Sequence, residues 1–306
     1  VKIQYPGIRR SIDSDVDNVA TLLRVSGLLP KSLDIKPLLD EAKKQLHDEA
    51  DYRREGACMM QFASLLADAD EFIVPEMHED LTTENILAMT RLDGDAVETL
   101  IHQPQAERDR IVSQLFRLLF REIFEFRLIQ TDPNFANYRY AAASQQLILL
   151  DFGATRAYPA SMVDSYRQLM NCATRNDRQG MNEAAMAIGY FQQDIKENQR
   201  QAVLDIFALA CEPLGHMGEY DFGTSDLGVR IRDAGMVLGM DRDFWHTPPA
   251  DALFLHRKLG GLYLLAAKLK ARLDVNGLAG SLLGLETTVT EAEGCLLRST
   301  GKNGQN

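Results

Sequence analysis

This 306-residue chain lacks any hydrophobic run that is long enough to cross a lipid bilayer as a helix. Its longest apolar stretch, at residues 259–269, is interrupted by Lys268 and falls well short of the roughly 20 residues that a spanning helix needs. Basic residues are scarce too, because 33 Lys and Arg stand against 44 Asp and Glu, for a net charge of −11. That balance argues against a general nucleic-acid-binding protein, which needs clustered cations to contact phosphates.

Cysteines are few and are not grouped. No CxxC pair and no Cys/His spacing suited to a metal occurs, so the sequence predicts neither a zinc site nor a disulfide framework; the four cysteines are Cys58, Cys172, Cys211 and Cys295. A reducing compartment fits this usage best. An initiator methionine and a signal or transit pattern are also missing, and the chain begins inside a strand-like run, so we expect further sequence upstream.

What the chain does have is enough apolar sequence, 45% of its residues, to bury a sizeable core in one large domain or two lobes. Residues 1–5, 71–74 and 85–92 predict short strands, because each apolar run is closed by a Pro or Gly turn signal. Between the first two we expect a helix with two partly buried faces, one with Leu39, Ala42, Leu46, Ala50, Arg53 and Ala57, the other with Tyr52, Glu55, Met59 and Phe62. Residues 1–92 should therefore form a small, strand-containing N-lobe.

The pattern changes to helix from Ala106 onward, where apolar residues recur at helical spacing: Ile111, Leu115, Leu118, Leu119, Ile123 and Phe126. After residues 128–138 come two short β-like runs joined by a polar connector, and then an Asp-Phe-Gly turn. Beyond residue 161 the sequence is mostly helical in pattern. We expect residues 93–300 to form a larger helical C-lobe and residues 301–306 to be a disordered tail.

The stretch LIQTDPNFANY, at residues 128–138, carries the strongest chemical signal. Taken alone, Asp132 is better explained as a helix cap and Pro133 as a stop signal, and an isolated Asp-Phe-Gly is a weak motif. The order and spacing favour a site, because Asp132 is followed by Asn137 in a D-x-x-x-x-N pattern and a hairpin then leads to Asp151. This arrangement is typical of phosphoryl-transfer sites of the protein-kinase type.

The predicted hairpin would place Asn137 and Asp151 side by side. An amide oxygen and a carboxylate could then both bind Mg²⁺ on ATP phosphates, since this hard cation prefers oxygen ligands. Asp132 would point to the attacking hydroxyl or water and would orient it or accept its proton.

The same template requires a strand lysine that reaches the nucleotide phosphates and a helix glutamate that holds it. Lys2 occupies the lysine position, and Glu55 on the following helix is its expected partner. A lone strand lysine or helix glutamate is more often solvated than catalytic. The assignment is therefore supported only by the presence of the other motif residues. A hinge between the lobes is expected at Met89, Thr90, Arg91 and Leu92, and its backbone would bind the adenine edge. The alternative is that these residues form an ordinary core strand and turn.

These motifs together resemble the UbiB-type atypical kinase family, also called the aarF-domain-containing kinases, and are most similar to its mitochondrial coenzyme Q biosynthesis members. The resemblance rests on YPG after the VKIQ strand, on HDEADYRREGACMMQF, LIQTDPNFANY and LILLDFGATR, and on residues 254–274. It implies a protein-kinase-like bilobal α+β fold with nucleotide-binding Lys2 and Glu55, catalytic Asp132, metal ligands Asn137 and Asp151, and an E-x-D motif at Glu49 and Asp51.

The resemblance also implies ATP and Mg²⁺ as cofactors, ATPase activity in ubiquinone biosynthesis, and a place on the matrix side of the inner mitochondrial membrane. Expected partners are lipid or quinone-precursor intermediates, other coenzyme Q biosynthesis proteins and, peripherally, the membrane. Two departures stand out: the family's K-x-G-Q segment and alanine-rich loop do not precede Lys2 here, and no A-P-E motif follows the Asp-Phe-Gly turn. A Ser/Thr protein kinase and a nucleotide-gated scaffold remain as alternatives.

Overall fold

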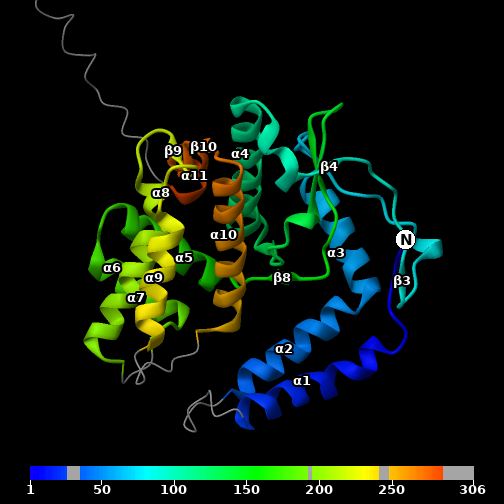
Figure 1. Ribbon diagram of the computed structural model, residues 1–306, viewed down its shortest axis with the longest axis horizontal. Coiled ribbons are helices and arrows are strands. Elements are labelled where there is room, and N and C mark those ends of the chain that lie inside the picture. The colour runs from blue at the N-terminus through cyan, green and yellow to red at the C-terminus, as the bar shows by residue number, and fades with distance from the viewer. Residues whose placement is uncertain (26–34, 192–194, 241–247, 285–306) are drawn as a thin grey trace, which may run out of the picture.

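The computed structural model describes residues 1–25, 35–191, 195–240 and 248–284, and the predicted tail at 301–306 lies outside them. The fold is mixed α+β, with long helices and short strands, as predicted (Figure 1). No helix of the described part is both long and apolar enough to span a membrane. The N-terminal elements are β1 (Lys2–Ile3), α1 (Ile8–Val25), α2 (Lys36–Glu49), α3 (Tyr52–Leu65), β2 (Phe72–Ile73), η1 (Glu79–Leu81) and β3 (Ile86–Leu87).

One prediction for this region was wrong: the long helix is two helices, α2 and α3, which meet at a sharp bend (Figure 1). The side chain of Asp51 accepts hydrogen bonds from the N–H groups of Arg53 and Arg54 and so begins a new helix. The second predicted face is buried as expected, with Tyr52, Glu55, Met59 and Phe62 pointing inward. The first face is mostly exposed: α2 packs on α1, Ala50 is buried and Leu39 is half-buried, but Ala42, Leu46, Arg53 and Ala57 are exposed.

The middle of the chain forms the sheet next to the loop at residues 131–137 and the Asp-Phe-Gly turn. Its elements are β4 (Asp95–Ala96), η2 (Val97–His102), α4 (Gln105–Arg121), η3 (Glu122–Phe126), β5 (Leu128–Gln130), η4 (Phe135–Asn137), β6 (Tyr138–Ala141), β7 (Gln146–Leu149) and β8 (Thr155–Ala157). The predicted hairpin is present as β6 and β7, and it joins a four-stranded sheet in the order β2-β7-β6-β4. Because β2 pairs with β7, this sheet crosses the expected lobe boundary at residue 92. Two further pairs, β1–β3 and β5–β8, flank it.

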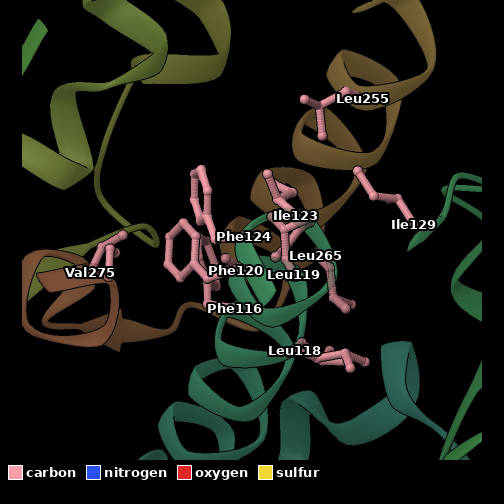
Figure 2. Packing of buried hydrophobic residues seen from close by; sticks show 14 of the residues in the cluster. Phe116, Leu118, Leu119, Phe120, Ile123, Phe124, Ile129, Leu255, Leu265 and Val275 are labelled. Carbon is pink, nitrogen blue, oxygen red and sulfur yellow. The ribbon is translucent and has the colours of Figure 1, made fainter. Parts of the chain in front are cut away.

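The remaining helices form a layered lobe beside this sheet (Figure 1). They are α5 (Ala160–Thr174), α6 (Arg178–Ile188), α7 (Glu197–Ala210), α8 (Glu212–Gly215), α9 (Leu227–Met240), α10 (Ala250–Lys268) and α11 (Val275–Leu283), with β9 (Tyr220–Asp221) paired to β10 (Arg272–Leu273). The core is centred on α4 and η3, where the rings of Phe116 and Phe120, from α4, and Phe124, from η3, lie in a row against side chains of α10 and α11 (Figure 2). The helical spacing predicted for α4 is confirmed.

The end of α4 is irregular in a way that matters for the site. The helix widens into a single π-helical turn, η3, and stops at Arg127, which has a left-handed backbone with φ 52. The N–H of Arg127 donates to the carbonyl of Glu122, and the chain then enters β5. This turn leaves the carboxylate of Glu122 inside the protein, where it is 1% exposed.

The interior of the helical lobe also predicts a pH dependence of stability. Burial lowers the pKa of His256 to about 4 from an ordinary value of 6.5, and its Nε2 lies 2.7 Å from the Tyr190 hydroxyl. Because the unfolded chain takes up this proton at a higher pH than the folded one, stability is present above pH 6.5 and is lost as the pH falls toward 4. Between pH 7 and 4.5, the free energy of unfolding should fall by about 2 kcal/mol less in His256→Gln than in the unaltered protein. Urea unfolding at the two pH values measures this difference. Equal losses would contradict a neutral, buried His256.

Candidate active site

Lys2 lies at the centre of the candidate site and contacts two carboxylates. Its ammonium Nζ donates to both oxygens of Glu55, each at 2.9 Å, and to Oδ2 of Asp151 at 3.0 Å. The three residues come from β1, from α3 and from the turn after β7, so segments up to 149 residues apart in sequence meet here. The Lys2 ammonium also lies 5.3 Å from the ring centroid of Tyr52, one turn before Glu55 on the same helix face.

The electrostatics of this cluster depend on burial. Glu55 is 1% exposed, and its desolvation, followed by repulsion from Asp151, raises the pKa of that carboxyl, while Lys2 opposes the rise. Desolvation by itself favours the neutral amine of Lys2, but attraction to Glu55 and Asp151 outweighs it and raises the pKa of Lys2. Lys2 therefore stays a cation at neutral pH and separates two carboxylates that would otherwise repel each other.

The loop between β5 and β6 presents Asp132 and Asn137. Oδ2 of Asp132 accepts a hydrogen bond from Nδ2 of Asn137 at 2.7 Å, and Oδ1 accepts from the N–H of Asn134 at 3.3 Å. Because the amide N–H of Asn137 donates to Asp132, the amide oxygen of Asn137 points away from Asp132. That oxygen is the atom that could bind a cation. The hydroxyl of Thr131 donates to the carbonyl of Ala154 at 2.7 Å and ties this loop to the Asp-Phe-Gly turn.

The Asp-Phe-Gly turn is held from both sides. Oδ1 of Asp151 accepts the N–H of Gly153 at 3.0 Å, and the buried ring of Phe152 packs 5.0 Å from Phe62 of α3. From α3, the guanidinium of Arg54 donates to the carbonyls of Gly153, at 2.8 Å, and Thr155, at 2.5 Å. Sequence reasoning missed Arg54, because an arginine next to Glu55 on a helix gives no signal of its contact to a segment some 100 residues away.

Several of these residues border a cleft of about 420 Å³, whereas Glu55 and Asn137 are not in its lining. Its lining includes Lys2, Glu49, Tyr52, Asp132, Asp151 and Gly153, together with Tyr5, Ile8, Ile12 and Asp15 of the N-terminal segment. A cleft of this size falls within the range of small-molecule sites. Its lining, with one cation, Lys2, and four carboxylates, Asp15, Glu49, Asp132 and Asp151, suits a phosphate group and a divalent cation together.

The donor set fits Mg²⁺ in particular. In the described ranges no group of three or more His, Cys, Asp or Glu is placed to hold a metal ion by itself. Mg²⁺ is instead commonly bound by one or two protein oxygens plus nucleotide phosphates and water. Asp151 and Asn137 are the residues that would supply those oxygens: both border a further, small cavity beside Phe152.

The predicted E-x-D pair is split by the bend between α2 and α3. Glu49 lies at the end of α2, borders the cleft and accepts a hydrogen bond from Gln45 at 2.8 Å. Asp51 is not among the residues that border the cleft, and its side chain caps α3. The structure therefore gives Asp51 a structural task, namely to begin the helix that carries Glu55.

This cap leads to a prediction. Asp51→Ala should lower the free energy of unfolding by about 1 kcal/mol, because two N–H groups of α3 lose their acceptor. Asp51→Asn keeps an acceptor oxygen at the same place and should lose much less. Chemical denaturation of both variants checks this, and equal destabilisation by Ala and Asn would argue that the charge of Asp51, not its cap, matters.

None of the expected hinge residues, 89–92, is among the residues that line the cleft. Met89 forms an antiparallel bridge with Met77, and the N–H of Thr90 donates to the carbonyl of Glu76 at 2.8 Å. Since backbone groups alternate in direction along an extended segment, those of Met89 point away from this pairing. Arg91 is exposed and pairs with Asp93.

Comparisons with known proteins agree with this picture. The profile of the ABC1 atypical kinase-like domain matches residues 1–185. The chain is 38% identical over 273 residues to "Atypical kinase COQ8B, mitochondrial" of Rattus norvegicus, covering 89% of this chain and 51% of the relative. It is 36% identical over 271 residues to "Atypical kinase COQ8, mitochondrial" of Saccharomyces cerevisiae, covering 89% and 54%.

A third relative, "Atypical kinase coq-8, mitochondrial" of Caenorhabditis elegans, is 35% identical over 282 residues, 91% of this chain and 37% of the relative. The chain thus spans about half the length, or less, of these relatives. Among solved structures, the complex of Rv3197 with erythromycin from Mycobacterium tuberculosis is similar with a TM-score of 0.67, covering 92% of this chain and 70% of that chain. At 19% identity, this likeness shows a common fold.

Proposed function

Because this chain belongs to the ABC1 atypical kinase-like family, we propose that it binds Mg-ATP in the cleft beside Lys2 and cleaves the terminal phosphate. The observation that carries this proposal is the cluster of Lys2, Glu55 and Asp151, in which one ammonium group contacts both carboxylates at 2.9–3.0 Å. A cation held in this way contacts phosphate oxygens by charge, while Glu55 keeps it in position. Bound Mg²⁺ would neutralise charge that develops on the phosphates.

The remaining residues have distinct parts in the proposed reaction. Asp132 orients the attacking water, accepts its proton as the new P–O bond forms, and receives support from Asn137 at 2.7 Å. The bond from the γ-phosphorus to the bridging oxygen breaks, so the products are ADP and inorganic phosphate. Asn137 and Asp151 are the residues that would supply oxygens to Mg²⁺, and backbone groups at Met89–Leu92 would contact the adenine edge.

The biological setting follows from the relatives. Their names describe mitochondrial atypical kinases, and we infer a role in ubiquinone (coenzyme Q) biosynthesis on the matrix side of the inner mitochondrial membrane. Lipid or quinone-precursor intermediates are the proposed substrates or cargo, with other biosynthesis proteins as partners and with peripheral contact to the membrane. The absence of an A-P-E motif after Asp151 supports a non-protein substrate, since that motif anchors the peptide platform of protein kinases.

The test separates hydrolysis from protein phosphorylation. Purified full-length protein is incubated with Mg-ATP labelled on the γ-phosphate, and release of free phosphate is compared with transfer to protein. We expect free phosphate and no transfer to protein in trans. Transfer that disappears in Asp132→Asn would instead establish a Ser/Thr protein kinase. Quinone synthesis by a variant that binds but cannot hydrolyse ATP would establish a nucleotide-gated scaffold.

A further inference from the structure

Beneath the loop that carries Asp132 and Asn137 lies a buried lysine that this mechanism does not use. Nζ of Lys258, on α10, is 3.1 Å from Oε1 of Gln130 and 2.7 Å from the hydroxyl of Tyr138. Gln130 is the last residue of β5, and Tyr138 is the first of β6, so the two ends of the loop meet at one ammonium group. The ammonium also lies 5.4 Å from the ring centroid of Tyr138.

The charge of Lys258 is balanced inside the protein. Nζ lies 3.3 Å from Oε2 of Glu122, on the π-helical turn after α4, and the side chains are 7% and 1% exposed, respectively. Burial by itself favours the neutral amine, but attraction to Glu122 and Tyr138 outweighs it and raises the pKa of Lys258. Replacing such a pair with apolar side chains is often neutral or stabilising, so stability alone does not explain two buried charges here.

A second contact lies one helical turn further along α10. A Cβ atom added at Gly261 would lie 2.7 Å from Cβ of Pro133 and 3.3 Å from its carbonyl oxygen. Pro133 directly follows Asp132, so only a glycine lets the helix approach this close to the loop. Residues three apart share a helix face, so Lys258 and Gly261 contact the same loop from the same side.

We propose that Lys258, together with its counter-charge Glu122, is a positioning residue that fixes the loop carrying Asp132 and Asn137 on α10. This inference rests on the proposed function for its catalytic consequence but not for its structural one. Lys258 fixes the ends of the loop, and Gly261 sets the distance of the loop from the helix. A shift of the loop by a fraction of an ångström would misplace Asp132, and misplacements of about 1 Å can reduce turnover about 100-fold.

The first test uses two adjacent glycines of α10. Gly261→Ala should displace Pro133 and lower the turnover of Mg-ATP about tenfold or more, with nucleotide affinity changed less than threefold. Gly260→Ala is the matched control, because a Cβ there meets nothing within 4 Å. It should keep turnover and should not lower the melting temperature, since alanine favours a helix.

The second test removes both buried charges at once, so that neither is left unpaired. In the full-length protein, Lys258→Met with Glu122→Gln should fold cooperatively, and hydrogen exchange should speed up about tenfold or more in peptides covering residues 128–138. Turnover of the double variant should fall with little change in nucleotide affinity. Lys258→Arg, which keeps both charges, should retain more turnover than the double variant. The control is Lys268→Met with Glu98→Gln, an exposed ion pair at 2.9 Å that joins the end of α10 to η2.

The outcomes are distinct. A folded double variant with unchanged exchange in residues 128–138 and unchanged turnover overturns the proposal. Exchange that rises throughout the protein, or loss of cooperative unfolding, also overturns it, because Lys258 would then be a general core residue. If the unaltered protein hydrolyses no ATP, the proposed function fails, and the exchange experiment still decides whether Lys258 positions the loop.

Discussion

Asp151→Asn is expected to reduce Mg-ATP turnover about 1,000-fold. The carboxylate of Asp151 contacts Lys2 at 3.0 Å, and it is the charged member of the proposed Mg²⁺ pair. An asparagine of the same shape keeps the hydrogen bond from the Gly153 N–H but cannot neutralise the cation. Phosphate release at saturating ATP over a Mg²⁺ titration measures the loss.

Stability should not fall together with turnover, which separates this effect from unfolding. Asp151 repels Glu55 and helps to raise the pKa of that carboxyl, so its neutralisation relieves a repulsion. The melting temperature of Asp151→Asn should therefore stay the same or rise. Asp233→Asn, the same change at an exposed ion pair on α9, is the control and should leave turnover intact. Turnover in Asp151→Asn equal to that of the control would contradict the proposed site.

Lys2→Met should affect both binding and folding. We expect nucleotide affinity to fall about 10- to 100-fold, because charge-assisted hydrogen bonds to phosphate are lost. The free energy of unfolding should fall by about 2 kcal/mol, since Glu55 loses its cation. This is less than for a fully buried ion pair, because the Lys2 side chain is 36% exposed and solvent screens its charge. Nucleotide titration by calorimetry and urea unfolding measure the two effects.

A second substitution should separate those effects. Lys2→Met with Glu55→Gln leaves no buried carboxylate without a cation, so stability should return toward that of the unaltered protein while affinity stays low. Lys43→Met serves as the control, because its partner Asp17 lies on α1, outside the cleft lining. Recovery of affinity in the double variant would show that Lys2 acts only by shielding Glu55.

Much of the fold was accessible from local patterns. The helical spacing from Ala106 predicted α4, and the runs after residue 137 predicted the hairpin of β6 and β7; both are confirmed. The α+β kinase-like fold and the atypical kinase family are confirmed as well. The prediction of one continuous helix across residues 39–62 was wrong. Asp51 caps a new helix after a bend, and the apolar spacing of the sequence continues through that bend without marking it.

By itself, the sequence determined which chemistry this protein can support, because residue types and their order along a loop and hairpin are local properties. The pairing of Lys2 with Glu55 was expected from the sequence, but tertiary structure alone decided which further charges and polar groups meet. The contact of Lys2 with Asp151, the hydrogen bonds from Arg54 to the turn after Asp151, and the buried pair of Lys258 and Glu122 join segments between 99 and 149 residues apart. Such pairings form because folding removes water from certain charged side chains, which then need a partner of opposite charge. The spacing of residues along the chain does not show which side chains these are.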